Sequence, residues 1–90
     1  MSIISMPYGI IVAIYYEDIV RHNKPPYIHV RYQGKKASIS IEDGTVLAGN
    51  FPAKQLRLVL AWIDIHHDEL MADWELAVSG EEPFRIAPLQ

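Results

Sequence analysis

The hydrophobic pattern of this chain changes its period once, and that change limits the folds open to it. Between residues 9 and 48, apolar and polar residues mostly alternate. Between residues 52 and 79, apolar residues recur at spacings of three or four: Leu56, Val59, Leu60, Ile63, His67, Leu70, Trp74 and Ala77. Alternation is typical of strands, and a period of about 3.6 is typical of helices. The sequence therefore predicts an α+β fold, a small and mostly antiparallel sheet over residues 3–48 packed by a long or broken C-terminal helix over residues 52–79.

One strand is expected to be buried on both faces. Residues 9–16 form an almost continuous run of β-branched, aromatic and other apolar residues, which suits such a strand. Residues 17–26 then become polar and end in Pro25 and Pro26. Because a double proline cannot donate to a sheet ladder and holds the chain extended, we expect a loop here.

The next residues predict a hairpin. Residues 27–33 and 36–42 both alternate between apolar and polar side chains, and a short turn at Gly34 and Lys35 separates them. An aspartate–glycine turn follows, and residues 45–48 then form a fourth short strand.

The helical region carries its own start and stop signals. Pro52 is tolerated in a first helical turn, whereas Gly80 and Pro83 end the helix. A break near residues 66–68 would divide it into two pieces, with Asp68 as a cap for the second, and a single rod fits the pattern equally well. The tail is expected to be anchored on the core by Phe84, Ile86 and Leu89.

The apolar surface exceeds what one sheet and one helix can bury. The strand over residues 9–16 is apolar on both faces, and the helix carries a second apolar stripe of Leu58, Trp62 and Ile65. The tail or a second helical piece could cover the excess, and so could another chain. We favour association with a copy of the chain or with a small protein partner. The acidic residues of the helix are expected to form a solvated face: Asp64, Asp68, Glu69, Asp73 and Glu75.

Composition excludes several classes of protein. Half of the 90 residues are apolar and 21% are charged, which is typical of a globular chain, and the length suits a single domain over residues 1–90. The absence of cysteine excludes disulfides and thiolate metal sites. No apolar run is long enough to span a membrane and no signal peptide is evident, so we expect a cytoplasmic protein without membrane contact. The net charge of −3 gives little support to nucleic-acid binding. Basic residues at the loop and hairpin keep a local nucleic-acid contact open as an alternative.

The polar side chains best suited to chemistry lie around the predicted loop and the strand after it. His22 is on the loop, and His29 lies on the polar strand face between Tyr27 and Arg31, with Ser38 expected across the hairpin. An imidazole titrates near neutral pH and can act as acid or base, and a guanidinium can stabilise an anion. These residues outline a metal-independent phosphodiester site. A solvated strand face beside a rigid loop fits them as well.

The candidate catalytic residues are therefore His22, His29 and Arg31. The candidate binding residues are Tyr27, His29, Arg31, Lys35 and Lys36. No cofactor is expected, because the sequence has no glycine-rich phosphate cradle, nucleophile elbow or HExxH motif. No metal ligands are assigned, because His66 and His67 are adjacent and point about 100° apart on a helix. Two histidines of the loop region with Glu17 and Asp18 leave a metal-binding module as a further alternative.

Several strings of this sequence resemble the family of small bacterial proteins catalogued as domain of unknown function 4160. They are Ser5–Ile11, Tyr15-Tyr16, His22-Asn23, Pro25-Pro26, His29, Ala37–Glu42, Leu56–Leu60, Trp62, His66, Glu69-Leu70, Trp74–Ala77 and Ile86–Leu89. Members usually read His-Asn-Pro-Pro-His-aromatic-His in the most specific stretch. This chain instead has extra residues before the prolines, among them Lys24, and Tyr27 in the place of the middle histidine. An activity that needed that histidine would be absent here.

The resemblance implies a genetic context, and the family brings no known activity. Such proteins look like one half of a two-gene unit similar to toxin–antitoxin pairs, beside a second short protein catalogued as domain of unknown function 2442. The leading hypothesis is an interaction protein of such a unit, which acts by binding rather than by catalysis. The alternatives are a small metal-independent ribonuclease or RNA-binding module that uses His22, His29 and Arg31, and a metal-binding module.

Overall fold

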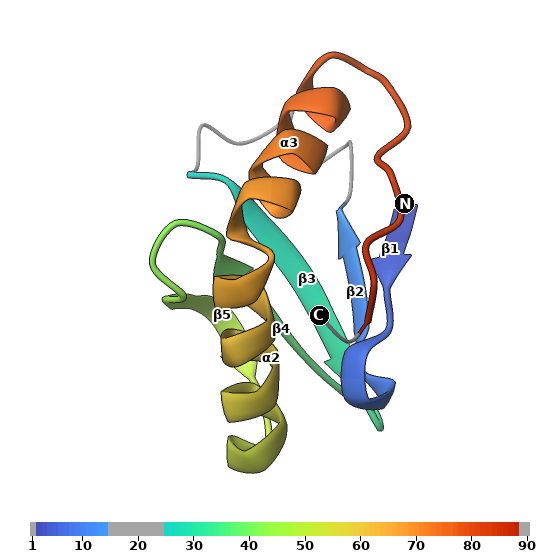
Figure 1. Ribbon diagram of the computed structural model, residues 1–90. Helices are drawn as coiled ribbons and strands as arrows, with labels where there is room; N and C mark the ends of the chain where they lie inside the picture. The colour runs from blue at the N-terminus through green and yellow to red at the C-terminus, as the bar shows by residue number, and fades with distance from the viewer. Residues whose placement is uncertain (1, 15–24, 89–90) are drawn as a thin grey trace.

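The computed structural model describes residues 2–14 and 25–88 and confirms the α+β prediction (Figure 1). Its elements in chain order are β1 (Ser2–Ser5), the 3₁₀ helix η1 (Pro7–Gly9), β2 (Ile11–Ile14), β3 (Tyr27–Tyr32), β4 (Lys35–Ser40), β5 (Val46–Asn50), α2 (Ala53–Ile65) and α3 (His67–Val78). Residues 1, 15–24 and 89–90 lie outside this description. The loop predicted over residues 17–26 therefore falls largely outside it.

The five strands form one antiparallel sheet in the order of the sequence, β1-β2-β3-β4-β5. β1 was not distinguished as a separate strand in the sequence pattern. The strand predicted from residue 9 begins at Ile11, because the turn of η1 reverses the chain between β1 and β2. Tyr8 and Gly9 make that reversal with φ angles of 54° and 75°.

The hairpin of β3 and β4 forms as predicted, with its turn one residue earlier. Tyr32 and Lys35 are direct partners, so the two-residue turn consists of Gln33 and Gly34. Both have positive φ, 46° and 80°, which matches the twist of a tight hairpin.

β5 lies against β4 with a bulge, and a glycine makes their close approach possible. The register shifts between Ser38 and Ile39, whose partners in β5 are Ala48 and Val46, so Leu47 is the extra residue. Gly49 has φ of 89°, and a Cβ atom there would lie 2.4 Å from the carbonyl oxygen of Lys36. A side chain at position 49 would therefore force the two strands apart.

The helical region is two helices, which decides between the two alternatives left by the sequence. The break falls at His66, whose backbone (φ −103°, ψ 23°) leaves helical geometry and serves as the N-cap of α3 in place of the predicted Asp68. The imidazole of His66 is buried, lies 5.1 Å from the ring of Trp62, and has its Nδ1 atom 2.5 Å from Oε1 of Glu69. His67, which the apolar spacing placed in the core, is half-buried instead.

Both helices cover the same face of the sheet (Figure 1). The core lies between the helices and the sheet and is made of aliphatic and aromatic side chains. Its buried members include Val12, Ile28, Val30, Ile39, Val59, Ile63, Leu70 and Trp74. The second apolar stripe is divided: Trp62 is buried, whereas Ile65 is 60% exposed. In the part of the chain that the structure describes, no helix is long and apolar enough to cross a membrane.

The C-terminal tail runs beside β1 (Figure 1) and is held by hydrogen bonds. The backbone N–H of Ile86 donates to the carbonyl of Ile4 at 2.9 Å, and the hydroxyl of Ser5 donates to the carbonyl of Ile86 at 2.7 Å. The indole N–H of Trp62 donates to the carbonyl of Ala87 at 3.0 Å. Ile86 is buried as expected, but Phe84 is 73% exposed, so its ring does not anchor the tail on the core.

Asp73 departs from the predicted solvated acidic face. Its side chain is buried, and its Oδ1 atom accepts the backbone N–H of Phe84 at 3.0 Å. Its Oδ2 atom has no hydrogen-bond partner among the described residues. Removal from water raises the pKa of the Asp73 carboxyl above its usual value, and the nearby charge of Glu69 acts in the same direction. The carboxyl therefore holds the start of the tail against α3 at an electrostatic cost.

Replacing Trp74 tests the core. Trp74 is only 8% exposed, so Trp74→Ala is expected to lower the free energy of unfolding by about 3–5 kcal/mol. Ile65→Ala, on the exposed side of the helical layer, should change it by less than about 0.5 kcal/mol. Chemical denaturation followed by fluorescence or circular dichroism measures both. Equal losses of unfolding free energy in the two variants would contradict the burial of Trp74.

Replacing Asp73 gives a pH-dependent prediction. Because its pKa is raised, the folded chain binds the proton more tightly, and stability falls as pH rises through the interval between the unfolded and folded pKa values. Asp73→Asn keeps an acceptor for Phe84 and removes the charge, so its melting temperature should exceed that of the parent at pH 7. The difference should vanish below the ordinary carboxyl pKa of 3.8. A parent that is the more stable of the two at pH 7 would contradict this account.

Candidate functional site

The face of the sheet opposite the helices carries most of the polar residues singled out in the sequence. Direct partners in antiparallel strands point to the same face, so the register places residues in rows. One row crosses all five strands: Ile3, Ala13, His29, Ser38 and Ala48. The adjacent row on the same face consists of Ile11, Arg31, Lys36 and Asn50. We call these two rows the open face.

His29 occupies the middle of the first row. It is half-buried, and its Nδ1 atom lies 3.3 Å from the hydroxyl of Ser38, its direct partner in β4. Its ring also meets the ring of Tyr27 edge to face, with the centroids 5.4 Å apart. These contacts fix the imidazole at the centre of the sheet, and they confirm that Ser38 lies across the hairpin from His29.

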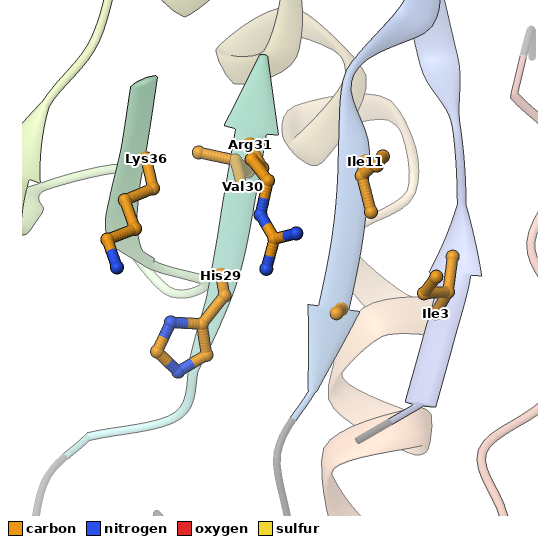
Figure 2. A pocket seen from close by; sticks show the side chains of 7 residues that line it. Ile3, Ile11, His29, Val30, Arg31 and Lys36 are labelled. Carbon is orange, nitrogen blue, oxygen red and sulfur yellow. The ribbon is translucent and has the colours of Figure 1, made fainter. Parts of the chain in front are cut away.

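Arg31 and Lys36 form a pair of like charges in the second row. They are exposed direct partners across β3 and β4. Within the described part of the chain, neither forms an ion pair with a carboxylate. Like charges directly opposite each other destabilise a sheet, so this pair favours the approach of an anion from outside. Figure 2 shows Arg31, Lys36 and His29 projecting to the same side of the sheet.

The other half of the open face is apolar. Ile3 is 37% exposed and Ile11 is half-buried. In Figure 2 the side chain of Ile11 lies next to Arg31 on the neighbouring strand β2, and that of Ile3 lies one strand further away, on β1. Together with Ala13 and His29 they line a shallow depression of about 60 Å³. Small-molecule pockets usually enclose about 300–1,000 Å³, so this depression is of a size that suits a single inserted side chain.

The structure does not bring all the candidate residues together. Tyr27 is only 5% exposed, because its ring packs 5.5 Å from that of Trp74 in α3, so the phenol belongs to the core. Lys35 pairs with Tyr32 in the row that alternates with the open face, so it lies on the helix side of the sheet. His22 lies outside the described residues. Of the predicted set, His29, Arg31 and Lys36 share one surface.

Sequence reasoning missed the aliphatic part of this surface. The apolar run over residues 9–16 predicted a strand with two apolar faces, which was a usable signal for Ile11. The position of Ile3 beside it depends on the pairing of Ile3 with Ala13. A non-local pairing of this kind leaves no local pattern in the sequence.

The histidines of the helical layer are separate from this surface and from each other. His66 is buried against Glu69, and His67 is half-buried with its Nδ1 atom 3.3 Å from Oδ1 of Asp68. The two histidines therefore have different environments, one buried and one partly exposed. Over residues 2–14 and 25–88, no three side chains of histidine, aspartate or glutamate gather closely enough to hold a metal ion.

The fold and the open face define an α+β domain with a one-sided helical layer and a cationic, partly aliphatic sheet surface. The chain belongs to the family described as domain of unknown function (DUF4160), whose model matches residues 9–75. This confirms the resemblance found in the sequence, and the matched part contains His29, Arg31 and Lys36. β1 and the tail that pairs with it lie outside the matched part. Neither a curated protein nor a solved structure gave a match to the chain.

Two neighbouring residues on β3 test the assignment of faces. His29 is half-buried on the open face, and Ile28 is fully buried on the helix side. His29→Ala should lower the free energy of unfolding by less than about 1 kcal/mol. Ile28→Ala should lower it by about 2–5 kcal/mol. Urea titrations of the two variants provide the comparison, and a loss at His29 as large as that at Ile28 would make the histidine a core residue.

Proposed function

We propose that this protein acts by binding a small acidic partner protein through the open face, as the interaction member of a toxin–antitoxin-like two-gene unit. The observation that carries the proposal is the pairing of Arg31 with Lys36 on a face that also carries the aliphatic side chains of Ile11 and Ile3. A partner carboxylate would neutralise the two cations, and a partner side chain would fill the adjacent depression.

The composition of the open face favours a protein as the ligand. Protein interfaces combine an apolar centre with arginine and a polar rim, and arginine binds a carboxylate through two parallel hydrogen bonds. Ile3 and Ile11 supply the apolar part, and the guanidinium of Arg31 supplies the two parallel donors. The depression of about 60 Å³ beside Ile3 and Ile11 has room for one partner side chain.

Family membership supports the choice of partner. The resemblance implies a neighbouring gene for a second short protein, catalogued as domain of unknown function 2442. That neighbour is the partner we propose, and the pair would resemble a toxin–antitoxin unit in which one protein controls the other by binding.

A second candidate function is a small ribonuclease. It is favoured by one observation, the presence of His29, Ser38 and Arg31 on the same face of β3 and β4. An imidazole beside a guanidinium can serve phosphodiester cleavage. In this proposal His29 and His22 act as the acid and the base, in either order. The cationic pair would then hold a phosphate instead of a carboxylate.

Charge reversal on the two sides of the molecule tests the proposed function. The chain is co-expressed with the product of the neighbouring gene, and their affinity is measured by calorimetry. The double change Arg31→Glu and Lys36→Glu should weaken binding by about tenfold or more. The matched control, Lys54→Glu with Arg57→Glu, alters net charge equally on exposed positions of α2 and should leave affinity unchanged. Equal losses in both variants, or no complex with the parent chain, would overturn the proposal.

Expression without the neighbouring gene distinguishes the second candidate. A ribonuclease should arrest growth and degrade cellular RNA, and His29→Ala should abolish both effects. A binding protein that lacks nuclease activity should leave RNA intact whether or not His29 is present. RNA integrity on a gel after induction gives the answer directly.

A further inference from the structure

The two edges of the sheet differ in how they are covered. At the β1 edge, the tail supplies the hydrogen bond from Ile86 to Ile4 and the contact of Ser5 with Ile86. At the β5 edge, no hydrogen bond from a described residue outside β4 reaches residues 46–50. Alternate backbone N–H and C=O groups of β5 therefore point outward, ready to pair with another strand.

β5 lacks the charged and proline residues that protect many edge strands. Natural edges commonly carry lysine, other charges or proline, which discourage pairing with another chain. β5 reads Val46-Leu47-Ala48-Gly49-Asn50, without a charge or a proline, and all five residues are exposed. Val46 and Leu47 are both 39% exposed, so apolar side chains accompany the unpaired backbone groups.

We propose that β5 pairs with β5 of a second copy of this chain, antiparallel about a two-fold axis at Ala48. In this register Ala48 faces Ala48 of the second copy, Leu47 faces Gly49, and Val46 faces Asn50. No charged residue meets a like charge in this arrangement, because β5 has none. Each five-stranded sheet continues into the other, and the dimer is isologous, the commonest symmetry among oligomers.

A bulge can turn an edge away from pairing, and the one in β5 also decides which residues a second strand would meet. It leaves Leu47 as the extra residue, without a direct partner in β4. The second copy would give Leu47 a neighbour at Gly49, which has no side chain to obstruct it. The occupant is a second copy rather than a charged peptide, because the strand offers only neutral groups for recognition. This inference is independent of the proposed function, since β5 is the edge and Arg31 and Lys36 lie on β3 and β4.

A cysteine placed at the proposed axis tests the geometry. The chain has no cysteine, so Ala48→Cys introduces the only thiol. Directly opposed residues in antiparallel strands have Cα atoms about 4.5–5.5 Å apart, which lies within the range that a disulfide spans. Under mild oxidation, this variant should form a covalent dimer on a non-reducing gel. The control Lys54→Cys, exposed on α2, should run as a single chain on the same gel.

Light scattering over a dilution series tests the contact without cross-linking. The parent chain should give twice its mass of 10.3 kDa at high concentration. Leu47→Lys, at an exposed position, should remain folded by circular dichroism and shift to the monomer mass, whereas the variant with Arg31→Glu and Lys36→Glu should remain a dimer. A parent that is monomeric at every concentration would overturn the inference. So would a dimer that survives Leu47→Lys and is lost on charge reversal of the open face, because the second copy would then occupy that face.

Discussion

The packing of two helices against one face of the sheet is the constraint on which the rest of the structure depends. The apolar sides of α2 and α3 meet the sheet through residues such as Val59, Ile63 and Leu70, all buried against strand residues. A single layer of helices cannot cover a second sheet face. The opposite face must therefore be polar, or covered by something else, and this chain has mixed composition there. That mixture of Ile3 and Ile11 with Arg31 is the reason to treat the open face as a binding surface.

The parts of the fold that depend on local sequence could be predicted. Alternation located the hairpin, and helical spacing located the helical region that contains α2 and α3, because each pattern is repeated over many residues. Features set by tertiary packing could not be predicted. Asp73 looks like a surface acid, but its side chain is buried and accepts the backbone N–H of Phe84 from the tail. The cap at His66 comes with burial of its imidazole against Trp62, which helical periodicity does not encode.

The candidate site was also predictable only where it depends on local sequence. The alternation of β3 placed His29 and Arg31 on one face, and the hairpin placed Ser38 opposite His29. Tyr27 belongs to the same alternation by position, yet its ring packs with Trp74, because the large aromatic gains more from burial at the end of the strand than from solvent. Lys35 and Lys36 are adjacent in sequence, but only Lys36 lies on the open face.

The open face and the β5 edge would act together. A two-fold axis that joins β5 to β5 within a continuous sheet runs perpendicular to that sheet, so both open faces point in the same direction. Each dimer would then present two sets of His29, Arg31 and Lys36 on one side. A partner that is itself dimeric could engage both sets, and the second contact would form at the high effective concentration set by the first. Weak binding at each small, charged surface would then suffice for a stable complex, which fits a depression too small to anchor a partner by itself.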